Sequence, residues 1–252
     1  MHHMPREVRL AAALLEASDT LTEAFDTMDY LQRLSDHCVE LLSARAAGIM
    51  LIVGGEAVSL AGSSRQREVA LDLLTAQHGG GPCLESYGSG RPVPPVSISA
   101  AHTASRWPAF TERALSHGIA ATYAVPLRRR ETRLGALNVF VPTPPNGDPH
   151  RDESELLVAQ ALADAAAVGL QNHRVYAQYR DLAGQLEEAL SSRVRIEQAK
   201  GMLAERWDTG ADEAFIALRQ YARRSRLPLD LVARAVIERV ADDAELRREA
   251  DG

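Results

Sequence analysis

Cysteine, lysine and long apolar runs are scarce in this sequence, and each scarcity excludes a class of protein. Only 2 of the 252 residues are cysteine, too few for a disulfide framework, which favours a reducing, cytoplasmic location. No stretch approaches the roughly 18 consecutive apolar residues of a transmembrane helix, so no membrane partner is expected. The formal net charge of −6 argues against a protein that coats nucleic acid without selectivity, because such proteins are basic.

Lys200 is the sole lysine among the 28 basic residues of the chain. Arginine replaces lysine wherever only the charge matters, so Lys200 is either a position that requires a compact ammonium group or a chance survivor. Basic residues outnumber acidic ones over 193–226, whereas the segments on either side are acidic. This basic island in an acidic chain predicts a confined contact with a negatively charged partner.

The sequence offers no catalytic constellation, no metal site and no cofactor motif. Its histidines lack the spacing of metal ligands, and Gly79-Gly80-Gly81 is not followed by the Gly-Lys-Ser/Thr of a phosphate-binding loop. Cys83, shortly after these glycines, fits either a redox sensor or a small buried apolar residue. We therefore expect a protein that is not an enzyme.

The N-terminal part of the chain, 20–170, is predicted to be an α+β (α/β) domain with a central antiparallel sheet. Asp29 is the expected cap of a helix that runs to Leu42. Two prolines in 93–98 remove ladder donors, so that strand is placed at an edge of the sheet. The other expected helices are 6–17, 64–77 and 108–117, and the other expected strands are 46–53, 57–61, 119–127 and 133–141.

A long connecting helix is predicted over 152–192, with a heptad pattern that continues into the next module. The pattern's central members are Val168, Asn172, Val175, Tyr179, Leu182 and Leu186. A single Asn at a core position favours a parallel, two-stranded coiled coil, because Asn pairs best with the Asn of a second copy. We predict a homodimer, although the same pattern also fits a helix packed on its own domain.

Two shorter helices are expected after the long one, which makes an all-α, three-helix module over 186–242. Thr209 and Asp212 resemble a capping box at the start of the first short helix. Pro228 suits the first position of the second. The residues expected to face inward are Phe215, Leu218 and Ala222 on the first, and Leu231, Val232, Ala235 and Val236 on the second.

This module resembles the ANTAR domain family. The matching residues are Leu186, Ala189, Leu190, Arg193 and Ile196 to Leu203, then Asp212 to Phe215, Leu218, Arg219 and Tyr221 to Arg223, and finally Ala233, Val236 and Ile237. The resemblance implies RNA binding, in which the protein holds a nascent transcript in a twin-hairpin antiterminator form and so prevents termination. It also implies regulation by dimerisation.

Residues 20–170 are similar to GAF sensor domains. The similarity rests on Gly81-Pro82-Cys83, Gly90 to Val93, Trp107-Pro108 with Phe110, Val125 to Leu127, and Leu134 to Asn138. It implies a sensor of an unidentified small molecule or other signal. The signature of cyclic-nucleotide GAF domains is absent apart from Asp152-Glu153, so a cyclic nucleotide is not predicted.

Five residues of the module are predicted to bind RNA: Gln198, Lys200, Arg219, Tyr221 and Arg223. The three cations can neutralise phosphates, Gln198 can bond to a base edge, and Tyr221 can stack on a base. Each has an ordinary alternative. The cations also fit a solvated helix face or partners of Glu197 and Glu213, and Tyr221 also fits the rim of a core.

The combined prediction is a cytoplasmic, dimeric regulator that senses a signal through its GAF domain and binds antiterminator RNA through its ANTAR domain. Two other functions stay open. Some GAF domains are methionine sulfoxide reductases, whose chemistry needs a nucleophilic and a resolving thiol close together. Three helices with an arginine stripe can also mimic a DNA-binding helix-turn-helix.

Overall fold

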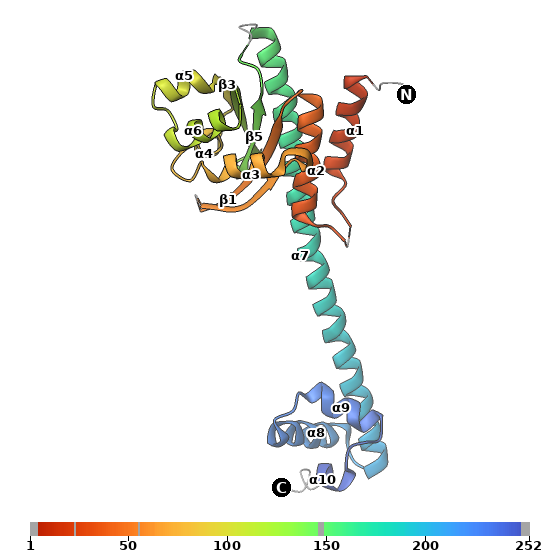
Figure 1. Ribbon diagram of the computed structural model, residues 1–252. Helices are drawn as coiled ribbons and strands as arrows, with labels where there is room; N and C mark the ends of the chain where they lie inside the picture. The colour runs from red at the N-terminus through yellow and green to blue at the C-terminus, as the bar shows by residue number, and fades with distance from the viewer. Residues whose placement is uncertain (1–4, 23, 55, 146–148, 248–252) are drawn as a thin grey trace. The chain divides into compact units, whose positions relative to one another are not determined.

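The computed structural model describes residues 5–22, 24–54, 56–145 and 149–247 (Figure 1). The chain divides into two compact units, Met1–Tyr176 and Ala177–Gly252. Helix α7, Pro149–Trp207, contributes residues to both. No helix in the described part of the chain is long and apolar enough to cross a membrane.

A five-stranded antiparallel sheet forms the centre of the first unit. Its strands are β1 (Ala46–Val53), β2 (Glu56–Gly62), β3 (Val93–Ser97), β4 (Ala121–Arg129) and β5 (Thr132–Val141), in the order β2-β1-β5-β4-β3. The expected strands 46–53 and 57–61 pair in one hairpin and 119–127 and 133–141 in another, with Leu51 opposite Ser59 and Val125 opposite Leu137. β3 lies at an edge, where a strand tolerates proline.

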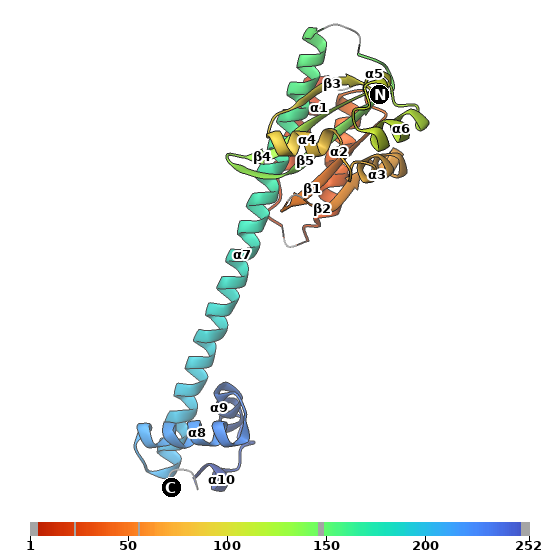
Figure 2. The same cartoon turned by 90° about the vertical axis from the view of Figure 1, so that its left-hand side faces the viewer.

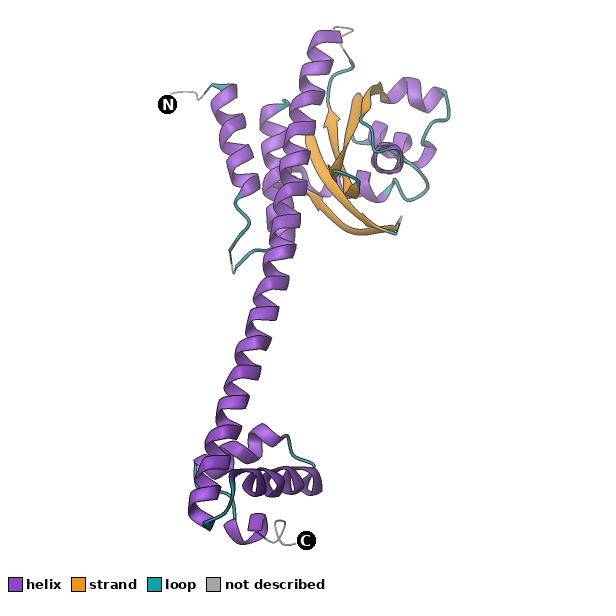
Figure 3. Cartoon of the chain, turned by 180° about the vertical axis from the view of Figure 1, so that it is seen from behind, coloured by secondary structure: helices purple, strands orange, loops and turns teal. Residues whose placement is uncertain are grey.

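Helices cover both faces of this sheet (Figures 1 and 3). One face carries α1 (Arg6–Ser18), α2 (Thr27–Leu41) and the N-terminal part of α7, and the other carries α3 (Arg67–Thr75), α4 (Pro82–Ser89), α5 (Ile98–Thr103) and α6 (Pro108–Ser116). The short helix η1 (Ser64–Gln66) precedes α3, and the backbone N–H of Ser64 donates a hydrogen bond to Asp36 of α2. Successive residues of β5 point into the two cores, because Leu137 and Val139 pack beneath α1, α2 and α7, while Ala136 and Phe140 pack on the other side. The predicted α+β fold is confirmed.

Asp26 caps α2, so the prediction of Asp29 as the cap is wrong. The Asp26 carboxylate accepts hydrogen bonds from the backbone N–H groups of Met28 and Asp29, both at 2.8 Å. Asp29 instead lies in the first turn of the helix, where a negative charge is also favourable. Two aspartates three residues apart satisfy the same sequence rule, and only the backbone conformation distinguishes them.

The connection between α1 and α2 is fastened to α7 by close backbone contact. The Thr20 hydroxyl donates to the carbonyl of Gly169 at 2.9 Å, and both residues are buried. A side chain at Gly169 would place its Cβ 2.3 Å from the carbonyl oxygen of Ala17. Glycine at this position is therefore what allows α1 to lie against α7.

The second unit consists of the C-terminal part of α7 with α8 (Ala211–Ser225), α9 (Leu229–Ile237) and α10 (Asp243–Arg247) (Figure 2). These elements share one core, formed by Ala199, Leu203, Trp207, Ala214, Ala217, Leu218, Ala222, Val232, Ala233, Val236 and Leu246. The three predicted helices are present, but the prediction missed α10. Its Leu246 is fully buried and closes the core.

The caps of α8 and α9 are displaced by one residue from their predicted positions. Gly210 is the N-cap of α8, and its N–H donates to Glu213 Oε2 at 3.3 Å. The Thr209 hydroxyl donates to the same carboxylate, so the expected pairing of Thr209 with Asp212 is wrong. Pro228 is the N-cap of α9 rather than its first helical residue.

Three apolar side chains expected inside the module, Phe215, Leu231 and Ala235, are only partly buried or exposed. Leu231 is 49% exposed, and Ala233 takes its place in the core. On α8, Phe215 is half-buried, whereas Ala214 and Ala217 are fully buried. Small residues at these contacts let the helices approach closely, and the larger side chains are left at the margin.

Candidate nucleic-acid interface

The exposed face of α8 presents two arginines one helical turn apart. Arg219 and Arg223 are exposed, and within the described residues neither side chain has a hydrogen bond or ion pair. Ala217, Leu218 and Ala222 hold the opposite face in the core. Both guanidinium groups are therefore open to solvent, which fits an anionic partner and also the solvated helix face that the sequence allowed. Ile216 lies on the same exposed face, one turn before Gln220, and is 51% exposed. Sequence reasoning did not identify this apolar side chain beside the arginines.

Lys200 and Gln198 occupy different environments on α7. Gln198 is exposed, with its neighbour Ala199 fully buried in the core. Lys200 is half-buried, and its Nζ lies 2.5 Å from Glu197 Oε2 in an i,i+3 ion pair. The glutamate is the alternative partner that the sequence allowed. An RNA phosphate must compete with this carboxylate for Lys200, whereas Gln198 needs no rearrangement.

Tyr221 lies at the rim of the core rather than fully in solvent. Its ring is half-buried and packs against the apolar cluster of the second unit. An aromatic ring held in this way keeps only part of its surface for stacking on a base. Its role in RNA binding stays a prediction.

A bidentate ion pair between α7 and α9 was not found from the sequence. Arg195 donates to Asp230 through Nε at 2.7 Å and through a terminal nitrogen at 3.0 Å. The hydrogen bonds from Arg195 lower the pKa of Asp230, and those to Asp230 raise the pKa of Arg195. Arg195 belongs to the basic island by sequence, but its guanidinium group is already bound to the Asp230 carboxylate. Nothing in the local pattern relates two residues so far apart in the chain.

We expect the second unit to lose stability in acid partly through Asp230. Because the pKa of Asp230 is lowered on folding, its carboxylate stabilises the fold fully above its unfolded pKa of about 3.9, and this contribution is lost as the pH falls through the folded pKa. Asp230→Asn should therefore unfold at a lower temperature than the unmodified chain at pH 7. The gap should narrow towards about pH 3, measured by circular dichroism. A gap that stays constant would contradict this assignment.

The heptad residues fall into two groups. Val168 and Asn172 are half-buried within the first unit, and the Asn172 Oδ1 accepts a hydrogen bond from Arg129 at 3.2 Å. The side chains further along α7 are exposed apolar groups: Val175, Tyr179, Leu182 and Leu186. Within one chain these four side chains form an apolar stripe that is open to solvent.

The two cysteines are buried thiols on opposite faces of the sheet. Cys38 lies in the core beneath α1, α2 and α7, and Cys83 lies in the other core. Burial raises the pKa of both thiols to about 12, which disfavours the reactive thiolate. Among the described residues, no group of three His, Cys, Asp or Glu side chains is arranged to hold a metal ion.

These features define a chain of two units, in which an α+β domain with a central antiparallel sheet precedes a helical module with exposed arginines. The GAF domain family matches residues 26–171, and the ANTAR domain family matches 184–237. The GAF match covers more than half of the chain, so the chain belongs to the GAF domain family. It also carries a C-terminal ANTAR domain. This is the arrangement of a signal-regulated antitermination regulator. No curated protein matches the sequence.

Several solved structures resemble part of this chain. A GAF sensor protein from Burkholderia vietnamiensis is 19% identical with a TM-score of 0.47, and the match covers 68% of this chain and 99% of that one. The A. aeolicus nlh2 GAF domain in an inactive state is 12% identical (TM-score 0.45; 66% and 98% covered). The free methionine-R-sulfoxide reductase of Neisseria meningitidis is 15% identical (TM-score 0.44; 68% and 96% covered). Similarities this low carry no argument about function.

Proposed function

We propose that this chain is a dimeric regulator that binds twin-hairpin antiterminator RNA under the control of its GAF domain. The observation that carries the proposal is the pair of free arginines, Arg219 and Arg223, on the exposed face of α8 within the segment that matches the ANTAR family. Hairpin RNA is recognised through its backbone phosphates and the unstacked bases of its loops. Two guanidinium groups one turn apart suit adjacent phosphates, and either can also read a guanine edge.

The other residues differ in whether an existing contact must break before they can bind RNA. Gln198 offers a donor and an acceptor to a loop base without breaking an existing contact. Lys200 exchanges Glu197 for a phosphate, and the cost is small because the partner carboxylate is 57% exposed. Arg195 does not contact RNA, because Asp230 already occupies its fork. It acts by holding α9 against α7.

Dimerisation is supported by the apolar stripe on α7. Tyr179, Leu182 and Leu186 are between 50% and 69% exposed. They recur at alternating steps of three and four residues, which is the spacing of a two-stranded coiled coil. A second copy of the chain would bury these side chains against their own counterparts. Pairing of Asn172 with its counterpart would require the hydrogen bond from Arg129 to break.

We expect Leu186→Asp to weaken the dimer by at least about 100-fold. The change removes one buried leucine from each copy, worth about 1.5–3 kcal/mol apiece, and places two like charges in contact. Gly184→Asp adds the same charge at a position whose Cβ would meet no other atom, so it is the matched control. Sedimentation equilibrium measures both. A wild-type chain that stays monomeric at micromolar concentrations would contradict the dimer.

RNA selection tests the binding function against the DNA-binding alternative. The full chain is presented with a pool of RNAs that carry two hairpins with randomised loops. We expect enrichment of a shared loop sequence and retention of the selected RNA against an excess of duplex DNA of the same sequence. Failure to enrich any loop, or displacement of the RNA by the duplex, would favour a DNA-binding module instead.

The reductase alternative is disfavoured by the positions of the thiols. A nucleophilic and a resolving cysteine must meet to form a disulfide, with Cα atoms about 4.4–6.8 Å apart. Cys38 and Cys83 are separated by the sheet, and both are fully buried. We expect no reduction of free methionine sulfoxide that depends on Cys83. An activity abolished by Cys83→Ala would overturn this part of the proposal.

A further inference from the structure

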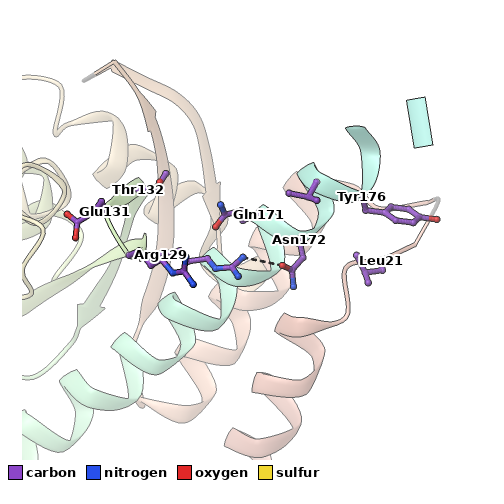
Figure 4. Close-up of a pocket in the computed structure, with 9 residues that line it drawn as sticks. Leu21, Arg129, Glu131, Thr132, Gln171, Asn172 and Tyr176 are labelled. Carbon is purple, nitrogen blue, oxygen red and sulfur yellow. Dashed lines mark hydrogen bonds between the residues drawn. The ribbon is translucent and has the colours of Figure 1, made fainter. Parts of the chain in front are cut away.

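A pocket lies within the first unit, where the turn between β4 and β5 meets α7 (Figure 4). Its volume is about 750 Å³, which is within the range of small-molecule sites. The turn contributes Arg129 to Thr132, α7 contributes Gln171, Asn172, Val175 and Tyr176, and the α1–α2 connection contributes Leu21. Three segments distant in the sequence therefore converge on one opening.

The polar groups of this pocket suit an anion. Arg129 reaches across the pocket to Asn172, as the dashed line in Figure 4 shows, with a donor–acceptor distance of 3.2 Å. Arg130 is exposed, and no ion pair or hydrogen bond of its side chain occurs among the described residues. Its φ of 53° lies in the left-handed region of a tight turn, and Arg129 and Arg130 both line the pocket. Glu131 lies on the far side of the pocket from Asn172 (Figure 4).

Two further features restrict the ligand. The Gln171 Oε1 is buried and lacks a hydrogen-bond donor, so an O–H or N–H group on the ligand would satisfy it. Leu21 is 57% exposed and Val175 is 42% exposed beside the polar groups, and each would be covered by an apolar portion of the ligand. The set of contacts fits a small anion with one donor group and an apolar body.

We propose that this pocket is the signal-binding site of the chain, and that it takes a carboxylate or phosphate compound with an apolar portion. The anion engages Arg129 and Arg130 through their planar forks, a stronger contact than the neutral amide of Asn172 offers. Asn172 is then released from the β4–β5 turn. This coupling rests on the proposed dimer, because Asn172 is one of the predicted coiled-coil core residues and, once free, can pair with its counterpart.

Binding is tested with a named probe on the full chain. Anilinonaphthalene sulfonate carries an anion, an N–H donor and an apolar body, and its fluorescence rises in an apolar site. We expect its dissociation constant to rise at least tenfold in R129Q/R130Q. The matched control, R65Q/R91Q, removes two exposed arginines outside the pocket and should change it less than twofold. Equal binding by the two variants, or no binding by the unmodified chain, overturns the proposal.

Competition identifies the anionic group. Octanoate that displaces the probe, when inorganic phosphate does not, assigns a carboxylate site, and the reverse assigns a phosphate site. Displacement by neither overturns the anion assignment. Gln171→Ala is a second variant that keeps the charge, and it should weaken the probe about threefold or more. An unchanged affinity in this variant would remove Gln171 from the site.

Coupling to the dimer is measured separately by sedimentation with and without the displacing anion. We expect the anion to strengthen association of the unmodified chain but not of Asn172→Ala. An anion that binds without changing association would overturn the coupling and leave the pocket assigned. A chain that is monomeric both with and without the anion would contradict the proposed dimer but not the pocket. The failure of the dimer and the failure of the pocket can therefore be distinguished.

Discussion

Arg219→Ala combined with Arg223→Ala is expected to lower affinity for a selected two-hairpin RNA about 100-fold. Each exposed guanidinium contributes about 1.4 kcal/mol or more to contacts with phosphates or base edges, which is a factor of about ten per residue. The slope of log affinity against log salt concentration should shrink by about 2. If one arginine reads a base, the variant lacking it should also lose preference for the selected loop sequence.

The matched control for this experiment is Arg234→Ala. Arg234 also lies in the second unit and is exposed, but it is paired with Glu238 at 2.8 Å on α9. The Arg234→Ala variant loses one positive charge, but the side chain that it removes is already paired and is not a candidate RNA contact. Fluorescence anisotropy of labelled RNA at several salt concentrations measures all variants. If the double arginine variant binds like the control, the interface lies elsewhere on the module.

Phe140→Ala is expected to destabilise the first unit by about 3–5 kcal/mol. The ring is fully buried on β5, with its centroid 6.3 Å from that of Phe110. Its removal loses apolar burial and leaves a cavity between the sheet and the helices on that face. Trp107 packs edge-on against Phe110, so its fluorescence reports the unfolding of this core.

The measurement needs one background change, because the chain has 2 tryptophans and Trp207 lies in the other unit. Urea unfolding is therefore followed in Trp207→Phe chains with and without Phe140→Ala. Val58→Ala, at a position on β2 that is 56% exposed, is the control and should stay within about 0.5 kcal/mol. A loss of less than about 1 kcal/mol for Phe140→Ala would mean that this core is loosely packed.

The elements of the sheet could be predicted because their signals are local. Two prolines place 93–98 at an edge, and apolar runs on either side of a short turn predict each hairpin. The α2 cap could not be assigned uniquely, because Asp26 and Asp29 both satisfy the rule for a capping residue. The inward face of α9 is predicted correctly at Val232 and Val236 but not at Leu231, because apolar residues occur on more than one side of that short helix.

In the candidate site, contacts within one helix could be predicted from the sequence, whereas contacts between distant segments could not. The free arginines of α8 could be predicted because residues four apart share a helix face. Glu197 lies three residues before Lys200 on the same helix, so their ion pair is also within reach of sequence reasoning, and the exchange of this pair for a phosphate stays a proposal. The contact between Arg129 and Asn172 joins a turn to a distant helix, so periodicity in either segment cannot reveal it.

Transcription through a terminator in vitro directly measures whether the chain prevents termination. A template is built with the selected two-hairpin RNA upstream of an intrinsic terminator, and the fraction of full-length transcript is measured with increasing amounts of the chain. We expect readthrough to rise with the unmodified chain and to stay at the basal level with the variant lacking Arg219 and Arg223. Readthrough that does not rise, or that rises equally with both proteins, would contradict the proposed function.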